Sequence, residues 1–240
     1  MTTRLSRYLA RAGVTSRRGA AGLVASGKVR INGRPASGPG DPVEEGDVVT
    51  VEGRRVVPVS LRWILLHKPT GYVTSRAPTA RFRPVFDLLE KDEALVAVGR
   101  LDVMSEGALL LTTDGGLAAR LMHPRHQVPR RYAVEVAGDP GPEGLAAIRR
   151  GVKVDDGPPV RALDVRFSPG RAGGRLELTL TEGRNRVVRR LCAALGLPVR
   201  KLVRTAYGPV NLGDLERGAS RPLTGSEVTK LYKSVDLTPP

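Results

Sequence analysis

The fold assignment depends on the segment Val98-Gly99-Arg100-Leu101-Asp102-Val103-Met104-Ser105-Glu106-Gly107, which continues as ALLLTTDG to residue 115. Asp102 follows an apolar, β-prone stretch and precedes a turn and a second apolar stretch. A carboxylate at the end of a buried strand loses water and needs a compensating charge, for which Arg100 is the nearest in sequence. Such a group is either half of a structural ion pair or a nucleophile. Taken alone, the segment favours the ion pair, and the rest of the chain reverses that preference.

Composition sets the limits of the fold and of the compartment. At 240 residues, 40% of them hydrophobic, the chain can build one large domain or two smaller ones. No apolar run approaches the roughly 20 residues that span a bilayer, and the N-terminal MTTRLSRYLARAG lacks the apolar centre of a secretion signal. We therefore expect a cytoplasmic protein without a membrane partner. A single cysteine, Cys192, and three histidines exclude an internal disulfide and disfavour a metal centre.

The net charge of +15 points to a polyanionic partner. Two stretches, 1–34 and 184–204, contain many basic residues and no acid. Simple solubility charge predicts interspersed acids, and neither stretch has the apolar face of a membrane-surface helix. We therefore expect two surfaces that contact the phosphates of a nucleic acid. Their basic residues are Arg4, Arg7, Arg11, Arg17, Arg18, Lys28, Arg30 and Arg34, and Arg184, Arg186, Arg189, Arg190, Arg200, Lys201 and Arg204.

The N-terminal 58 residues read as a small α/β module. Apolar residues at helical spacing predict a first helix that ends at Gly13, and Thr15-Ser16 can cap a second. Asn32-Gly33 is a strong signal for a tight hairpin turn. The other elements expected here are a helix over 17–26 and strands over 28–31 and 47–51.

The stretches RLSRYLARAGVTSRRGAAGLVASGKVRINGRP and EEGDVVTV resemble the αL RNA-binding domain of the ribosomal S-four type. The resemblance implies a domain over 1–58 whose two helices face RNA. The residues that it places on phosphates are Arg4, Arg7, Arg17, Arg18 and Lys28. The alternative is a helical cap that only packs on the larger domain.

The remainder, 61–240, reads as an α+β domain, because strands outnumber helices and no regular β-α alternation is present. We expect a mixed, mainly antiparallel sheet. The expected strands are 63–67, 131–136, 160–167, 175–181 and 198–204, and the expected helices are 85–89, 117–122, 144–150, 184–195 and a small helix that ends near 232.

Four stretches of this domain resemble the RsuA-type pseudouridine synthase family: HKPTGYV, GRLDVMSEGALLLTTDGGLA, RRYAVEV and EGRNRVVRRLCAALGLPVRKLVRTAYGPVNLG. Within the family, GVKVDDGPPVRA and LMHPRHQVPRRYAVEV are most similar to members that act on large-subunit rRNA. One departure is Val187, which stands where the family usually has glutamine. The resemblance implies isomerisation of uridine to pseudouridine in rRNA, with large-subunit (23S) rRNA as the expected substrate. It implies no cofactor and no metal.

The resemblance also assigns roles. It makes Asp102 the catalytic carboxylate, with attack on C1′ and removal of a ribose proton both left open. Arg189 is the cation beside Asp102 (alternatively a phosphate contact), and Tyr132 stacks on a flipped base (alternatively an ordinary strand aromatic). Further RNA contacts are expected at Lys68, Arg100, Arg184 and Arg186.

Other functions fit less well. A synthase acting on small-subunit rRNA or tRNA is poorly separated by sequence, and a non-catalytic RNA-binding assembly factor has no need for Asp102, Tyr132 and Arg189 together. A hydrolase using Asp102 and Glu106 lacks sugar-binding aromatics, since only 4% of the residues are aromatic. We therefore expect a monomeric rRNA pseudouridine synthase whose partner is rRNA, from the large-subunit precursor.

Overall fold

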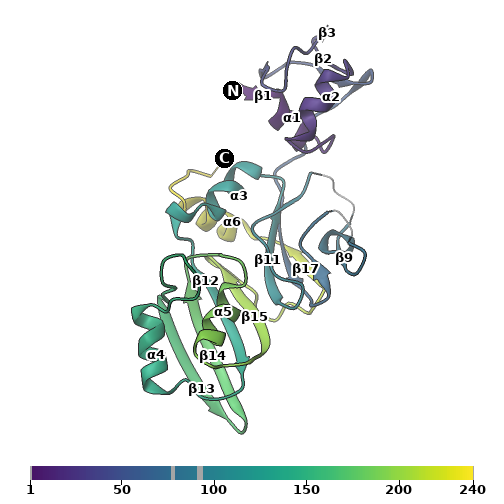
Figure 1. Ribbon diagram of the computed structural model, residues 1–240. Helices are drawn as coiled ribbons and strands as arrows, with labels where there is room; N and C mark the ends of the chain where they lie inside the picture. Colours follow the sequence, from purple (N-terminus) through teal and green to yellow (C-terminus); the bar gives the residue numbers. More distant parts are fainter. Residues whose placement is uncertain (1, 77–78, 91–93, 240) are drawn as a thin grey trace. The chain divides into compact units, whose positions relative to one another are not determined.

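The computed structural model describes residues 2–76, 79–90 and 94–239. Two compact units are present (Figure 1). The first comprises the chain up to Trp63, a short segment that ends at Val96, and Thr112–Gly115. The second comprises Ile64–Glu90, Ala97–Leu111 and the chain after Gly116. Within the described part of the chain, no helix has both the length and the apolar character needed to cross a bilayer.

The first unit is built from two short helices and a small sheet that share one apolar core. Its core residues are Leu5, Leu9, Ala20, Val24, Val29, Val43 and Val49. The elements are β1 (Thr3–Arg4), α1 (Leu5–Arg11), α2 (Gly19–Ala25), β2 (Val29–Ile31), β3 (Arg34–Pro35), β4 (Pro42–Val43), β5 (Val49–Val51) and β6 (Arg54–Arg55). The order β3-β2-β5-β6 forms one antiparallel sheet, and β1 pairs with β4.

The structure has the expected hairpin turn at Asn32-Gly33 and a hydrogen bond to the Ser16 side chain near the start of α2. Asn32 and Gly33 both have positive φ, 50° and 79°, and they connect the paired residues Ile31 and Arg34. This is the geometry that a two-residue hairpin turn requires. The Ser16 hydroxyl accepts a hydrogen bond from the Gly19 amide at 3.0 Å, which satisfies a free N–H at the start of α2.

The second unit contains a nine-stranded sheet. Seven of its strands follow the order β13-β14-β12-β15-β11-β7-β17, and the other two, β10 and β16, pair with β11 and β15. The pairs β13–β14, β14–β12 and β12–β15 are antiparallel, and β11–β15 is parallel. The expected mixed, mainly antiparallel α+β fold is therefore confirmed. The strands are β7 (Trp63–Lys68), β10 (Val96–Ala97), β11 (Glu106–Thr112), β12 (Arg130–Val136), β13 (Asp164–Gly170), β14 (Gly173–Leu180), β15 (Val199–Tyr207), β16 (Val210–Asn211) and β17 (Ser220–Pro222), with β8 (Tyr72–Val73) and β9 (Arg83–Pro84) forming a separate parallel pair.

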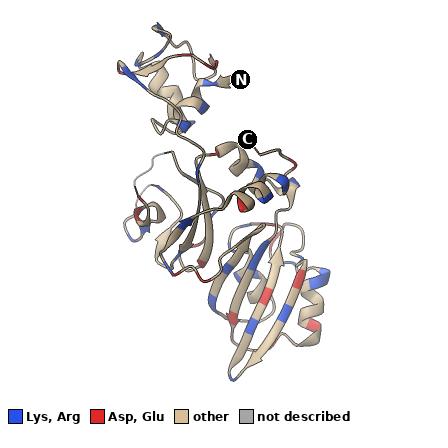
Figure 2. Cartoon of the chain, turned by 180° about the vertical axis from the view of Figure 1, so that it is seen from behind, with Lys and Arg blue, Asp and Glu red and all other residues tan. Residues whose placement is uncertain are grey.

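Two helices cover one face of this sheet. Ile148 of α4 and Leu191 of α5 share a core with Tyr132, Val134 and Leu178 of the strands (Figure 1). The opposite face of β12, β13 and β14 carries exposed basic and acidic side chains on neighbouring strands (Figure 2). The helices are α3 (Gly115–Met122), α4 (Gly141–Arg150), α5 (Val187–Ala194) and α6 (Gly225–Lys233), with 3-10 turns η1 (Val85–Leu88) and η2 (Pro124–His126).

Several expected boundaries were wrong, including the starts of one strand and one helix of this unit. The strand expected at 160–167 begins at Asp164, and Val160 instead forms an isolated bridge to Val152. The helix expected from residue 184 begins at Val187, because Arg186 adopts a left-handed conformation with φ 51° that cannot continue a right-handed helix.

Gly107 allows a very close approach between two strands of the sheet. Its φ is +114°, and a Cβ added there would lie 2.3 Å from the backbone oxygen of Arg204 and 2.6 Å from its backbone nitrogen. Gly107 and Arg204 are register partners in the parallel pair β11–β15. A side chain at position 107 would therefore push β11 away from β15 at the point where the chain leaves the Asp102 turn.

We expect Gly107→Ala to lower the free energy of unfolding by roughly 3 kcal/mol or more, because backbone strain and overpacking add. Chemical denaturation of the purified variant measures this loss. Gly225→Ala is the matched control in the same unit, since a Cβ at that helix terminus meets nothing within 4 Å. If the two variants unfold at the same denaturant concentration, the close approach at Gly107 is not a constraint on the fold.

Candidate active site

Asp102 lies in the turn that connects the segment after β10 to the start of β11. The Ser105 amide donates to the Asp102 carbonyl at 3.0 Å, which closes the turn. The Asp102 side chain is half-buried, and its carboxylate forms no hydrogen bond or ion pair with any residue in the described ranges. The carboxylate expected at a strand end therefore lies in a turn, where it is partly shielded from solvent.

Lys68, at the end of β7, holds this turn from inside. Its side chain is fully buried, at 0% exposure. The ammonium donates to the carbonyl oxygens of Pro69, Asp102 and Ser105 at 3.0, 3.1 and 2.9 Å. Burial lowers the pKa of Lys68 to about 8, and the negative charge of Asp102 opposes that shift. The phosphate contact expected of Lys68 does not fit this placement, because all three ammonium protons are already donated inside the protein.

Arg189 reaches the same turn from α5. Its Nη2 donates to the Met104 carbonyl at 2.6 Å, while its Nε is buried without a hydrogen-bond partner among the described residues. Burial lowers the pKa of Arg189, the charge of Arg186 lowers it further, and the charge of Asp102 raises it. Arg189 therefore lies within electrostatic range of the Asp102 carboxylate without a direct ion pair. Arg100, the nearest cation in sequence, has an exposed side chain.

Tyr132 comes to the site from β12 and is 7% exposed. It is the register partner of Arg204 on β15, which in turn is the partner of Gly107 on β11. The sheet therefore brings the tyrosine strand and the strand that follows Asp102 to the two sides of one arginine. The structure thus gathers Asp102, Tyr132 and Arg189 in one unit, from segments far apart in sequence.

Sequence reasoning missed the role of Arg204. It was counted only as one cation of the basic stretch 184–204, yet it is 2% exposed and donates to the carbonyls of Ala108 and Arg100 at 2.7 and 3.3 Å. Its position on β15 contained the signal. Leu202 and Ala206, two residues to either side, are buried, so a period of two places Arg204 on the same inner face.

The sequence also did not indicate the structural role of Glu106. Its carboxylate is 5% exposed and pairs with Lys201 Nζ and Arg217 Nε, each at 3.2 Å. These ion pairs fix the first residue of β11 to β15 and to the segment before β17. Glu106 therefore anchors the far end of the Asp102 turn, a structural use that its sequence context did not indicate.

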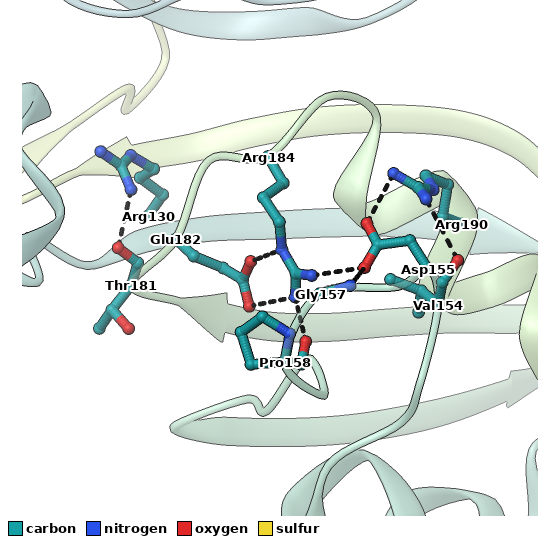
Figure 3. Close-up of polar contacts among 9 residues, drawn as sticks. All are labelled: Arg130, Val154, Asp155, Gly157, Pro158, Thr181, Glu182, Arg184 and Arg190. Atoms are coloured by element: carbon teal, nitrogen blue, oxygen red, sulfur yellow. Dashed lines mark hydrogen bonds and ion pairs between the residues drawn. The ribbon is translucent and has the colours of Figure 1, made fainter.

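Two arginines of the basic stretch are committed to internal contacts (Figure 3). Arg184 donates to Asp155 Oδ1 and to the Pro158 carbonyl, both at 2.7 Å, and also pairs with Glu182. Arg190 Nη1 pairs with the second oxygen of Asp155 at 2.9 Å. Arg184 and Arg190 together hold the loop around residues 154–158 against α5 and the segment that precedes it. Arg184 is consequently a poor phosphate contact, whereas Arg186 is exposed.

The basic residues of the first unit are distributed differently. Arg4, Arg7, Arg17 and Arg18 are exposed, and none forms an ion pair with another described residue. Lys28 is exposed but pairs with Glu52 at 2.5 Å. In the same described ranges, no group of three or more histidine, cysteine or acidic residues could hold a metal ion.

Comparison with known proteins identifies the class. Residues 62–194 match the RNA pseudouridylate synthase family, and residues 3–49 match the S4 domain. The chain belongs to the RNA pseudouridylate synthase family. It is therefore an RNA pseudouridine synthase, an isomerase, with an S4 domain at its N-terminus.

Several proteins resemble the chain over nearly its whole length. An "Uncharacterized RNA pseudouridine synthase" of Mycobacterium tuberculosis is 43% identical over 98% of this chain and 94% of its own length. The "Ribosomal large subunit pseudouridine synthase B" of Bacillus subtilis is 36% identical over 97% of each chain. A crystal structure of a pseudouridylate synthase is 29% identical and covers 95% of this chain and 99% of its own, with a TM-score of 0.66.

We expect the turnover rate of the enzyme to fall as the pH rises through about 8, where Lys68 loses a proton and one of its three donated hydrogen bonds. The free energy of unfolding should change in the opposite direction and rise with pH in this range. Because the folded pKa lies below the ordinary value of 10.5, burying the ammonium costs most below pH 8, and the cost is relieved between pH 8 and 10.5.

Single-turnover rates and denaturation midpoints between pH 6.5 and 9.5 separate these two effects. In Lys68→Met the rate should be low throughout, without the decline near pH 8. A decline of unchanged size in that variant would assign it to another group.

Proposed function

We propose that this enzyme converts a specific uridine of large-subunit rRNA into pseudouridine, with Asp102 as the essential carboxylate. The observation that supports this most is the half-buried carboxylate of Asp102, which pairs with none of the described residues and lies on a turn that Lys68 holds from inside and Arg189 from α5. The names of relatives in Bacillus subtilis and Pseudomonas aeruginosa favour large-subunit rRNA as the substrate.

The reaction is an internal rearrangement of one nucleotide. The N1–C1′ bond breaks, the base rotates, and a C5–C1′ bond forms. C5 then loses its proton, and N1 gains a proton. No electrons enter or leave, so the chemistry requires no redox carrier. Asp102 can attack C1′ or remove a ribose proton, and both roles need an ionised carboxylate that reaches the sugar. A base stacked in a helix does not expose these atoms, so the target nucleotide must flip out.

The neighbours of Asp102 fit complementary roles. Arg189 places a positive charge within electrostatic range of the carboxylate, and its contact with Met104 fixes the turn. Tyr132, held on a buried strand, offers the flat surface on which the flipped uracil stacks. We assign these three residues to the reaction.

RNA binding is assigned to exposed cations. We place the N-terminal RNA-binding domain at residues 1–58 and the catalytic domain at 61–240. Phosphate contacts in the first are Arg4, Arg7, Arg17, Arg18 and Lys28, and in the second Arg100 and Arg186. We further propose that the enzyme works as a monomer in the cytoplasm, where ribosomal precursors are assembled.

Asp102→Asn should reduce the single-turnover rate to below about 1% of wild type while RNA affinity changes by less than a few-fold, since the change is nearly isosteric but removes the reactive charge. Pseudouridine formation in an rRNA fragment, with binding measured in parallel, provides the test. Asp214→Asn, at an exposed position, is the control and should keep full activity. An Asp102→Asn preparation with more than a few per cent of wild-type rate would falsify the assignment.

Substitution of Arg4 and of Arg184 by glutamine should affect RNA binding differently. Arg4 is exposed and free of ion pairs with described residues, so its loss should lower the slope of log K against log salt by about 0.7–0.9, the value of one phosphate contact. Arg184 is engaged by Asp155 and Glu182, so its loss should leave the slope unchanged and lower the thermal midpoint instead. Equal slopes for Arg4→Gln and wild type would remove Arg4 from the RNA surface.

A further inference from the structure

β15 occupies the position between the two strands that carry the reaction's residues to the site. On one side it pairs in parallel with β11, where Arg204 faces Gly107; on the other it pairs antiparallel with β12, where Arg204 faces Tyr132. A register shift between Arg131 and Tyr132 interrupts the second ladder at this point. Such an irregularity re-aims the side chain that follows it, here Tyr132.

The Arg204 guanidinium connects both flanks of the Asp102 turn. Its Nη1 donates to the carbonyl of Arg100, two residues before Asp102, at 3.3 Å. Its Nε donates to the carbonyl of Ala108, six residues after Asp102, at 2.7 Å. With two nitrogen atoms bound in this way, the orientation of the planar group is fixed, and the third nitrogen has a set direction.

That third nitrogen, Nη2, is buried and has no hydrogen-bond partner among the described residues. The Tyr132 phenol lies within electrostatic and hydrogen-bonding reach of the Arg204 guanidinium. The centre of the Tyr207 ring lies 5.2 Å from the guanidinium carbon of Arg204. It also lies 5.0 Å from the guanidinium carbon of a second buried arginine, Arg130. Neither arginine pairs with a carboxylate in the part of the chain that the structure describes.

A buried guanidinium without a carboxylate is costly to the fold, and an unsatisfied buried N–H adds to the cost. Leu202 and Ala206 on the same face of β15 are apolar, so the buried charge is a feature of position 204 and not of this face as a whole. The carbonyls of Ala108 and Arg100 account for Nε and Nη1, and the free Nη2 donor is the part of the side chain that still lacks a use. Of the two described residues that the strand register places opposite Arg204, Gly107 and Tyr132, Tyr132 carries an acceptor side chain.

We propose that Arg204 is a positioning residue for the reaction, whose Nη2 donates to the Tyr132 phenol oxygen in the working enzyme and thereby sets the place of the Tyr132 ring relative to the Asp102 turn. Since Arg204 holds the carbonyls on both flanks of that turn, one side chain couples the two halves of the site. This inference rests on the proposed roles of Asp102 and Tyr132.

Arg204→Gln tests the proposal, with Arg130→Gln as its matched control. Both residues are buried arginines beside the Tyr207 ring, and Arg130 is bound to Tyr207 Oη at 3.1 Å and to the Thr181 carbonyl at 2.9 Å. Both variants should lose thermal stability. Only Arg204→Gln should lose single-turnover rate at saturating enzyme, by roughly 30-fold or more, a loss typical of a misplaced reacting group. RNA affinity should change by less than threefold in both.

A double-mutant cycle with Tyr132→Phe distinguishes positioning from general damage to the fold. If Arg204 acts through the phenol, Arg204→Gln should reduce the rate of the Tyr132→Phe enzyme by less than about threefold, because coupled residues are non-additive. Rate losses that multiply in the double variant overturn the proposal. Arg204→Lys, which keeps the charge but not the fork of donors, replaces Arg204→Gln in the cycle should the latter not fold.

A second measurement applies where Tyr132→Phe has no measurable rate. With 3-fluorotyrosine at position 132 of the full chain, the ¹⁹F resonance should shift or broaden in Arg204→Gln or Arg204→Lys and stay in place in Arg130→Gln. An unchanged resonance in the Arg204 variant overturns the proposal. Absence of pseudouridine formation by the wild-type chain on rRNA contradicts the proposed function instead, so the two failures are distinguishable.

Discussion

The geometry of the site depends on one buried ammonium group. Lys68 has no exposed surface, and it donates to three carbonyl oxygens that belong to the turn around Asp102 and to its own neighbour Pro69. Without those donors, the turn would bury carbonyl groups that water cannot reach. The same interaction places the positive charge of Lys68 within electrostatic range of Asp102, so one side chain both shapes the turn and brings a cation to the site.

The large positive charge of the chain serves two distinct purposes. In the second unit, Lys68, Arg184 and Arg204 hold backbone carbonyls or internal carboxylates in place and have little left for an outside partner. In the first unit, Arg4 and Arg7 are exposed and form no ion pair with the described residues. The net charge therefore overstates the number of phosphate contacts, because a share of the cations does structural work inside the catalytic unit.

Patterns with local causes could be predicted from sequence. The turn at Asn32-Gly33 needs two residues that tolerate positive φ, and the alternation of β12 shows which of its faces is buried. The start of α5 could not be found in this way, since Arg186 adopts its left-handed conformation inside a strongly helical pattern. The turn at Asp102 could not be placed in this way either, because its closing hydrogen bond and the Lys68 contact depend on the folded chain.

By itself, the sequence determined the α+β class and the two-part organisation of the chain, since these follow from short motifs and from periodicity. Only the tertiary structure decided which cations are free. Lys68, Arg184 and Arg204 look like the other basic residues in the sequence, yet strand pairing buries one beside Tyr132, another under the Asp102 turn and the third against Asp155. The contact partners of a side chain lie on other strands, and only long-range pairing determines which strands those are.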